Sequence, residues 1–238
     1  MNAHTPRYWA VIPAAGIGKR LGADRPKQYL ALGGKPILAH TLDRLRLHPR
    51  LAGVVVVISP DDRFWPRLTL ASAASRLMVT MGGAERCHSV LNGLLFLRET
   101  ADAQDWVLVH DAARPLLRRG DVDALVEQLG SHSVGGLLGV PVSDTIKRAA
   151  PNGDIHETVD RSQLWRAFTP QMFRLGMLTA ALQQTLAAGD VVTDESQAME
   201  RAGHRPKMVE GHSDNIKITR AQDLALAEYY LSQQREEL

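Results

Sequence analysis

Two glycines and two cations follow a short apolar segment near the start of the chain. Residues 8–12 (YWAVI) are apolar, and the sequence after them contains Gly16, Gly18, Arg20 and Lys27. Glycines let a backbone approach a ligand closely, and Arg and Lys supply the positive charge that phosphate oxygens attract. A strand that ends in such a loop is typical of a polyphosphate-binding site, so we expect one here.

The loop does not match the two best-known phosphate-binding motifs. The dinucleotide fingerprint needs a third glycine where this chain has Leu21, and no spacing here supplies the Gly-x4-Gly-Lys-Ser/Thr of a P-loop. With Gly22 and Pro26 in it, the loop is long enough to wrap a triphosphate instead of capping one phosphate at a helix end. The alternative is an ordinary glycine-rich turn with solvated charges.

Short apolar segments alternate with amphipathic ones along most of the chain. Residues 53–59 (GVVVVIS) form a β-branched run, which indicates a strand buried on both faces under helices. We expect further strands at 8–12, 77–80, 106–109, 136–142, 207–210 and 215–218, and helices at 36–47, 85–98, 121–129, 173–188, between 194 and 203, and after 219. The alternation predicts an α/β fold with a Rossmann-like, mostly parallel sheet, which binds ligands at the carboxyl ends of its strands.

An acidic residue stands at one of these strand ends. Asp111 comes after the strand 106–109, and a carboxylate there can hold Mg²⁺ against phosphate oxygens, since Mg²⁺ takes one or two carboxylates together with phosphate and water. Asp214 is a second candidate for the same ion, with a turn or a helix cap as its other possible role. We expect His110 to orient the Asp111 loop through a hydrogen bond and not to react.

Residues 143–168 interrupt the alternation. Two short alternating runs flank Pro151, Asn152 and Gly153, which predicts a β-hairpin. A lone hairpin is not stable by itself, so we expect this arm to stand off the sheet and to pack against a second copy of the chain. The prediction is one domain over residues 1–238 with the arm inserted in it, assembled as a homodimer.

The composition limits the classes of protein. Of the 238 residues, 45% are hydrophobic and 23% are charged, which suits an ordinary globular core. The 28 basic and 26 acidic residues leave a net charge of +2, too little for a general nucleic-acid-binding surface. The one cysteine, Cys87, excludes an intrachain disulfide and a thiolate zinc site and suits the cytoplasm. No apolar run reaches the ~20 residues that span a membrane, and we expect no secretory signal.

Several short motifs occur in an order that resembles one family. PAAGIGKR with PKQY is similar to the signature of nucleotidyltransferases that activate sugar or polyol phosphates. Later motifs resemble, in the same order, those of the 2-C-methyl-D-erythritol 4-phosphate cytidylyltransferases of the non-mevalonate isoprenoid pathway: GGAERCHSV (82–90), HDAARP (110–115), PVSDTIK (141–147), TVDR (158–161), TPQ (169–171), TDE (193–195) and VEGHSDNIKIT (209–219). The resemblance covers nearly the whole chain and implies a nucleotidyltransferase domain, an enzyme that uses Mg²⁺, and a homodimer.

The implied reaction is the transfer of CMP from CTP to 2-C-methyl-D-erythritol 4-phosphate, which gives 4-diphosphocytidyl-2-C-methyl-D-erythritol and pyrophosphate. A phosphate dianion must approach a triphosphate, so the catalyst must supply positive charge and positioning. It needs no general base, because a phosphate monoester with a second pKa of ~6 is already mostly ionised at neutral pH. This agrees with the lack of a Gly-x-Ser-x-Gly or His-Glu-x-x-His motif.

The resemblance also implies roles for the residues at matching positions. The implied catalytic residues are Arg20, Lys27, Arg161 and Lys217. The implied nucleotide contacts are Ala14, Ala15, Gly16, Gly18, Gly83, Ala84, Ser89 and Asp111. The implied substrate contacts are Arg114, Thr145, Arg161, Thr169, Thr193 and Lys217, and the implied metal ligands are Asp111 and Asp214. Many relatives carry Asp where this chain has Ala84, so a side-chain contact is lost there while a backbone contact survives.

The residues leave alternatives for the arm and for the substrate. Arg161 and Thr145 lie on or beside the arm, so they serve either their own site or that of the partner subunit, and an exposed ion pair is another role for Arg161. A second possible substrate is another polyol phosphate, such as ribitol 5-phosphate. A function from a different class is a CTP-binding sensor without catalysis.

Overall fold

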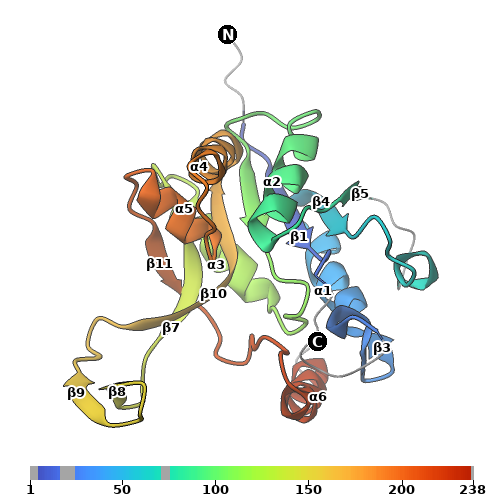
Figure 1. Ribbon diagram of the computed structural model, residues 1–238. Helices are drawn as coiled ribbons and strands as arrows, with labels where there is room; N and C mark the ends of the chain where they lie inside the picture. The colour runs from blue at the N-terminus through green and yellow to red at the C-terminus, as the bar shows by residue number, and fades with distance from the viewer. Residues whose placement is uncertain (1–4, 17–24, 71–75, 237–238) are drawn as a thin grey trace.

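The centre of the structure is a seven-stranded sheet in the order β11-β7-β10-β6-β1-β4-β5 (Figure 1). The computed structural model describes residues 5–16, 25–70 and 76–236. The strands of the sheet are β1 (Tyr8–Pro13), β4 (Leu51–Ile58), β5 (Leu77–Met81), β6 (Trp106–Val109), β7 (Gly135–Pro141), β10 (Trp165–Arg174) and β11 (Lys207–Glu210). Neighbours pair in parallel except at β10, which is antiparallel to both β6 and β7. The predicted α/β fold with a mostly parallel sheet is confirmed.

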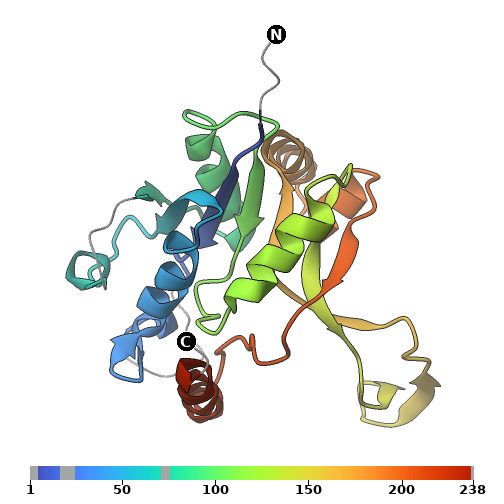
Figure 2. The same ribbon diagram turned by 180° about the vertical axis from the view of Figure 1, so that it is seen from behind.

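Helices cover both faces of this sheet (Figures 1 and 2). One face carries α1 (Ile37–Arg46) and α3 (Arg119–Leu129), and the other carries α2 (Arg86–Leu97), α4 (Leu175–Ala187) and α5 (Glu195–Arg201). Successive side chains of a strand point to opposite faces, so Val54 and Val56 of β4 lie on the face that α1 covers, while Val55 and Val57 lie on the face that α2 covers. The β-branched run is thus buried on both faces, as the sequence predicts.

A third group of apolar side chains anchors the last helix, α6 (Ala221–Glu236). Its Ala227 and Leu231 are buried with Leu32, Leu116 and Ile218. The N–H of Ile218 donates to the carbonyl of Ala113 at 2.9 Å, so the segment before α6 lies beside the loop that follows β6. The remaining small elements are the hairpin of β2 (Ala31–Leu32) and β3 (Lys35–Pro36) and the 3-10 helices η2 (Lys27–Tyr29) and η3 (Trp65–Arg67).

The arm is an antiparallel hairpin of β8 (Ile146–Ala149) and β9 (Ile155–Val159). Gly153, in the turn between them, has a φ of 92°, a conformation that glycine adopts without strain. The hairpin projects from the sheet beyond β7 and β10 (Figure 1). It is shorter than the predicted 143–168, because residues 165–168 pair with β7 and so belong to the central sheet.

Other predicted elements also differ from the structure, most of them by one or two residues at an end. Phe173 belongs to β10 and not to the following helix, because it pairs with Val107 of β6 and Gly135 of β7 and is fully buried. Residues 215–218 are irregular instead of forming a strand. No helix in the described part of the chain is both long enough and apolar enough to cross a membrane.

Candidate active site

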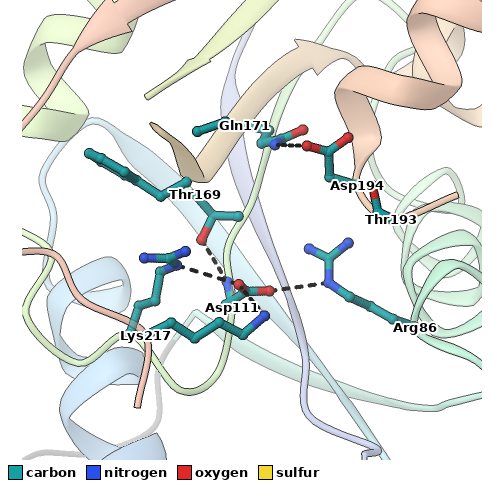
Figure 3. A pocket seen from close by; sticks show the side chains of 10 residues that line it. Arg86, Asp111, Thr169, Gln171, Thr193, Asp194 and Lys217 are labelled. Carbon is teal, nitrogen blue, oxygen red and sulfur yellow. Dashed lines mark hydrogen bonds and ion pairs between the residues drawn. The ribbon is translucent and has the colours of Figure 1, made fainter. Parts of the chain in front are cut away.

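A buried carboxylate lies at the carboxyl edge of the sheet. Asp111 follows β6, is 7% exposed, and faces a cavity of about 190 Å³ (Figure 3). The cavity is lined by Arg86, Asp111, Arg114, Ala167, Phe168, Thr169, Gln171, Thr193, Asp194 and Lys217. The sequence predicts Asp111, Arg114, Thr169, Thr193 and Lys217 as site residues, and the fold brings all of these together here.

Three cations surround the Asp111 carboxylate. Lys217 Nζ lies 2.9 Å and Arg114 Nε lies 3.4 Å from Asp111 Oδ2, while Arg86 Nε lies 3.1 Å from Oδ1. Burial by itself would raise the pKa of Asp111, but Arg86, Lys217 and Arg114 outweigh it and hold the pKa well below its usual range. Asp111 is therefore an anion at neutral pH.

The backbone of Asp111 is fixed by His110 and Thr169. The N–H of Asp111 donates to Thr169 Oγ1 at 3.0 Å, and His110 Nδ1 lies 3.0 Å from the same hydroxyl. His110 Nε2 lies 3.0 Å from the carbonyl of Arg114, which can only accept, so Nε2 carries the proton and Nδ1 accepts from the Thr169 hydroxyl. Burial lowers the pKa of His110 to about 4, so the neutral ring that this network requires is present at neutral pH.

The TPQ and TDE motifs meet on another side of the cavity. Gln171 Nε2 donates to Asp194 Oδ2 at 3.0 Å (Figure 3), and Gln171 Oε1 accepts from the N–H of Ser196 at 2.7 Å. Gln171 is 1% exposed, so both ends of its side chain are used to join β10 to the start of α5. This junction places Thr193 and Asp194 at the cavity wall.

Arg86, Gln171 and Glu195 are site residues that the sequence analysis does not single out. Arg86 and Glu195 are 109 positions apart, and their side chains form two hydrogen bonds, Nη1 to Oε1 at 2.6 Å and Nη2 to Oε2 at 3.2 Å. The motifs GGAERCHSV, TPQ and TDE contain all of these residues. Motif position alone does not tell which of these side chains meet.

The turn after β5 contacts the loop after β1. A Cβ added to Gly82 would lie 2.4 Å from the Cβ of Ala15 and 2.8 Å from Ser89 Oγ, so only glycine allows this approach. Ser89 Oγ accepts from the N–H of Gly83 at 3.1 Å, and Ala84 is exposed beside it. The fold therefore brings together Ala15, Gly83 and Ser89, which the sequence predicts as nucleotide contacts.

Gln28 holds the first part of the glycine-rich loop. Its Nε2 donates to the carbonyl of Ala14 at 2.7 Å and to that of Gly16 at 3.1 Å. Lys27 is the first residue of η2, next to this anchor. Two predicted site residues of the same loop, Gly18 and Arg20, lie outside the described residues.

The described residues of the loop after β1 and of the turn after β5 contribute nothing to the lining of this cavity, and three further predicted site residues also lie outside it. Thr145 and Arg161 are exposed and lie beside the arm, where Arg161 Nη1 donates to the carbonyl of Ser143. Asp214 is buried, and its Oδ2 accepts from Arg118 Nη2 at 2.7 Å and from Gln234 Nε2 at 3.0 Å. These contacts tie Asp214 to α6 instead of aiming it at Asp111.

The donor set fits a hard divalent cation that binds together with a ligand. In the described ranges, no group of three or more His, Cys, Asp and Glu side chains could form a metal site of their own. Mg²⁺ takes one or two carboxylates and completes its coordination with phosphate and water. Asp111 is ionised and faces the cavity, so it meets this requirement, whereas Asp214 does not line the cavity.

A mostly parallel sheet with a cation-lined cavity at its carboxyl edge defines an α/β protein of the nucleotide-binding class. The family model described as IspD, 2-C-methyl-D-erythritol 4-phosphate cytidylyltransferase, matches residues 8–233. The chain belongs to this family, whose members are nucleotidyltransferases.

Individual relatives agree with this family over almost the whole chain. A Pseudomonas entomophila (strain L48) protein named 2-C-methyl-D-erythritol 4-phosphate cytidylyltransferase is 57% identical over 225 residues, 94% of this chain and 95% of the relative. A Pseudomonas aeruginosa protein of the same name is 56% identical over 220 residues, 92% of this chain and 94% of the relative.

Solved structures show the same fold. A crystal structure of 4-diphosphocytidyl-2C-methyl-D-erythritol synthase is 40% identical and superposes with a TM-score of 0.82, covering 96% of this chain and 100% of its own. The Francisella tularensis 2-C-methyl-D-erythritol 4-phosphate cytidylyltransferase is 38% identical with a TM-score of 0.79, covering 94% of this chain and 99% of its own.

The buried neutral His110 predicts a pH dependence of stability. The pKa of His110 is about 4 in the folded protein and about 6.5 in the unfolded chain. The contribution of the neutral ring to the free energy of unfolding is therefore full above pH 6.5 and is lost as the pH falls toward 4. Over that range the free energy of unfolding of the wild type should fall by on the order of 3 kcal/mol more than that of His110→Gln, measured by urea denaturation. The control His156→Gln, in the exposed strand β9, should follow the wild type. If the free energy of unfolding changed equally with pH in the wild type and in His110→Gln, the prediction would be wrong.

Proposed function

We propose that this protein transfers CMP from CTP to 2-C-methyl-D-erythritol 4-phosphate, with release of pyrophosphate, in the synthesis of isoprenoid precursors. Membership of the family over residues 8–233 and the names of the relatives support the reaction. The observation that carries the proposal is the ionised Asp111, held with Arg114 and Lys217 in a cavity at the carboxyl edge of the sheet.

The reaction is a displacement at phosphorus. An oxygen of the substrate phosphate forms a bond to the α-phosphorus of CTP. The bond from that phosphorus to the oxygen bridging the α- and β-phosphates breaks, and its electron pair leaves with pyrophosphate. No side chain has to remove a proton, because the attacking phosphate is already mostly ionised. Negative charge gathers on the oxygens around phosphorus, so fixed cations lower the barrier.

The cations divide between the two reactants. Lys27 and Arg20 neutralise the triphosphate and the phosphorus under attack. Lys217 and Arg114 hold the substrate phosphate, since both already point into the cavity and bind a carboxylate there. Thr169 and Thr193, which line the same cavity, add contacts to the substrate.

The nucleotide lies across the loop after β1 and the turn after β5. The contact between Ala15 and Gly82 and the hydrogen bond from Gly83 to Ser89 support this placement. Backbone groups there read the cytosine ring, and small side chains leave room for it. The residues that we assign to this role are Ala14, Ala15, Gly16, Gly18, Gly83, Ala84 (through its backbone) and Ser89.

Asp111 is the residue that we assign to Mg²⁺. Asp111 would hold the ion, which would supply positive charge to the triphosphate of CTP. We do not extend this assignment to Asp214, because it does not line the cavity.

The arm forms a dimer and completes the site of the partner subunit. Almost every residue of the hairpin is exposed, including Ile155 at 64%. Arg161 and Thr145 lie outside their own cavity, so in this proposal they act from one subunit on the substrate in the other.

The single cysteine, which is buried, supports a cytoplasmic setting.

A pyrophosphate-release assay tests the activity. With Mg²⁺ and 2-C-methyl-D-erythritol 4-phosphate, CTP should give the fastest release among the four common nucleoside triphosphates, and EDTA should abolish it. Ribitol 5-phosphate in place of methylerythritol phosphate should be a poor substrate. Faster release with ribitol 5-phosphate would make that the substrate, and tight CTP binding without turnover on either phosphate would favour a sensor.

Lys27→Ala should lower kcat by about 100- to 1,000-fold, the usual effect of removing one preorganised charge donor from a transition state. Its affinity for CTP, measured by calorimetry, should fall much less. The control is Lys207→Ala, an exposed lysine of β11 away from the cavity, which should leave kcat unchanged. Equal losses of CTP affinity and turnover would show that Lys27 acts on the bound ground state instead.

Ile155→Asp should weaken self-association at least about tenfold, because the dimer would bury an unpaired charge in the arm. Sedimentation velocity over a concentration series measures this change. Leu47→Asp is the matched control, since Leu47 is 59% exposed and lies at the end of α1, away from the arm. A wild-type protein that stays monomeric at high micromolar concentration would rule out the proposed dimer.

A further inference from the structure

Arg86 differs from the other two cations on Asp111 because its side chain also binds a second carboxylate, that of Glu195. Its Nε binds Asp111 Oδ1 at 3.1 Å, and its Nη1 and Nη2 bind the two oxygens of Glu195 at 2.6 and 3.2 Å. A planar guanidinium held by two carboxylates at once has no freedom to rotate. Arg86 is thus a fixed bridge between Glu195 and Asp111.

Glu195 is itself fixed. It is the first residue of α5, is 1% exposed, and follows Asp194, whose side chain caps the helix by accepting from the N–H of Gln197 at 2.9 Å. Burial raises the pKa of Glu195, and the Arg86 guanidinium opposes this by stabilising the charged form. A buried ion pair seldom increases stability over an apolar pair of similar size. The pair therefore calls for a role beyond stability.

The two oxygens of Asp111 have different surroundings. Oδ1 faces the immobilised Arg86, whereas Oδ2 faces Arg114 and Lys217. The Lys217 side chain is 38% exposed and ends in a flexible ammonium group, so it can turn to an incoming phosphate at little cost. Arg86 is held by the buried carboxylate of Glu195, so it cannot turn toward the phosphate in the same way.

We propose that Arg86 and Glu195 are positioning residues: they hold Asp111 Oδ1 in place, so that Oδ2 is the oxygen that exchanges Lys217 for other partners when the substrates bind. Arg86 keeps the carboxylate in one orientation throughout, and Glu195 keeps Arg86 from turning to the phosphates. The inference rests on the proposed function, in that it takes Asp111 as the residue that meets the metal-bound nucleotide.

Two variants that preserve net charge test the role. Arg86→Lys keeps the positive charge but loses the planar fork that spans both carboxylates. The double variant Arg86→Gln/Glu195→Gln removes one charge of each sign, so no buried charge is left unpaired and the fold is retained. Any shared effect then reports the orientation of Asp111 and not a change in local charge. Arg46→Lys is the control, because Arg46 is also an ion-paired arginine but lies at the end of α1 and does not line the cavity.

The decisive measurement needs no turnover. The affinity for CTP is measured by calorimetry with Mg²⁺ and again with EDTA, and the ratio gives the metal-dependent gain. We expect both Arg86 variants to lose about 10- to 100-fold of this gain, the usual effect of removing a residue that orients a metal ligand. Their affinity for CTP in EDTA should equal that of the wild type, and kcat should fall by a similar factor. Arg46→Lys should change none of these, and thermal melting shows which variants are folded.

The outcomes separate the inference from the proposed function. A folded double variant with an unchanged metal-dependent gain overturns the positioning role. A loss of affinity for CTP in EDTA overturns it too, since Arg86 would then touch the nucleotide directly. If the wild type shows no metal-dependent gain, or Asp111→Asn keeps it, the assignment of Asp111 to Mg²⁺ is what fails.

Discussion

The charge of Asp111 is the constraint on which the site depends. A carboxylate buried without compensation would take up a proton or destabilise the fold, and three cations prevent this at distances of 2.9 to 3.4 Å. They come from the start of α2, the loop after β6 and the segment before α6, which are distant in the chain. Any change that moves one of these elements therefore changes the electrostatics of the whole cavity.

The antiparallel strand β10 is what makes this meeting possible. It runs against β6, so Gln171 pairs with Val109 and Thr169 comes beside His110 and Asp111. The same strand carries Phe168 and Ala167 to the cavity wall and leads back from the arm. One strand thus connects the hydrogen bonds behind the carboxylate with the hairpin that we propose as the dimer contact.

The site has a rigid half and a half that can respond to ligands. His110, Thr169 and Gln171 are all less than 5% exposed and make hydrogen bonds on both sides of their polar groups. Lys217 and the arm residues Thr145 and Arg161 are far more exposed. This division suits a reaction limited by charge repulsion, because a fixed anion can organise cations that then turn to the substrate.

The sequence by itself determined the α/β alternation and the place of Asp111 after a strand, because strand periodicity is a local signal. The resemblance of its motifs to one family implied Arg114, Thr169, Thr193 and Lys217 as residues of the same site. Only the tertiary structure decided that Phe173 extends β10 and that Arg86 meets Glu195. It also showed that Asp214 turns to Arg118 and Gln234. The physical reason is that strand pairing and buried ion pairs join residues about 40 to 110 positions apart. No local sequence pattern specifies which distant residue a given residue will pair with.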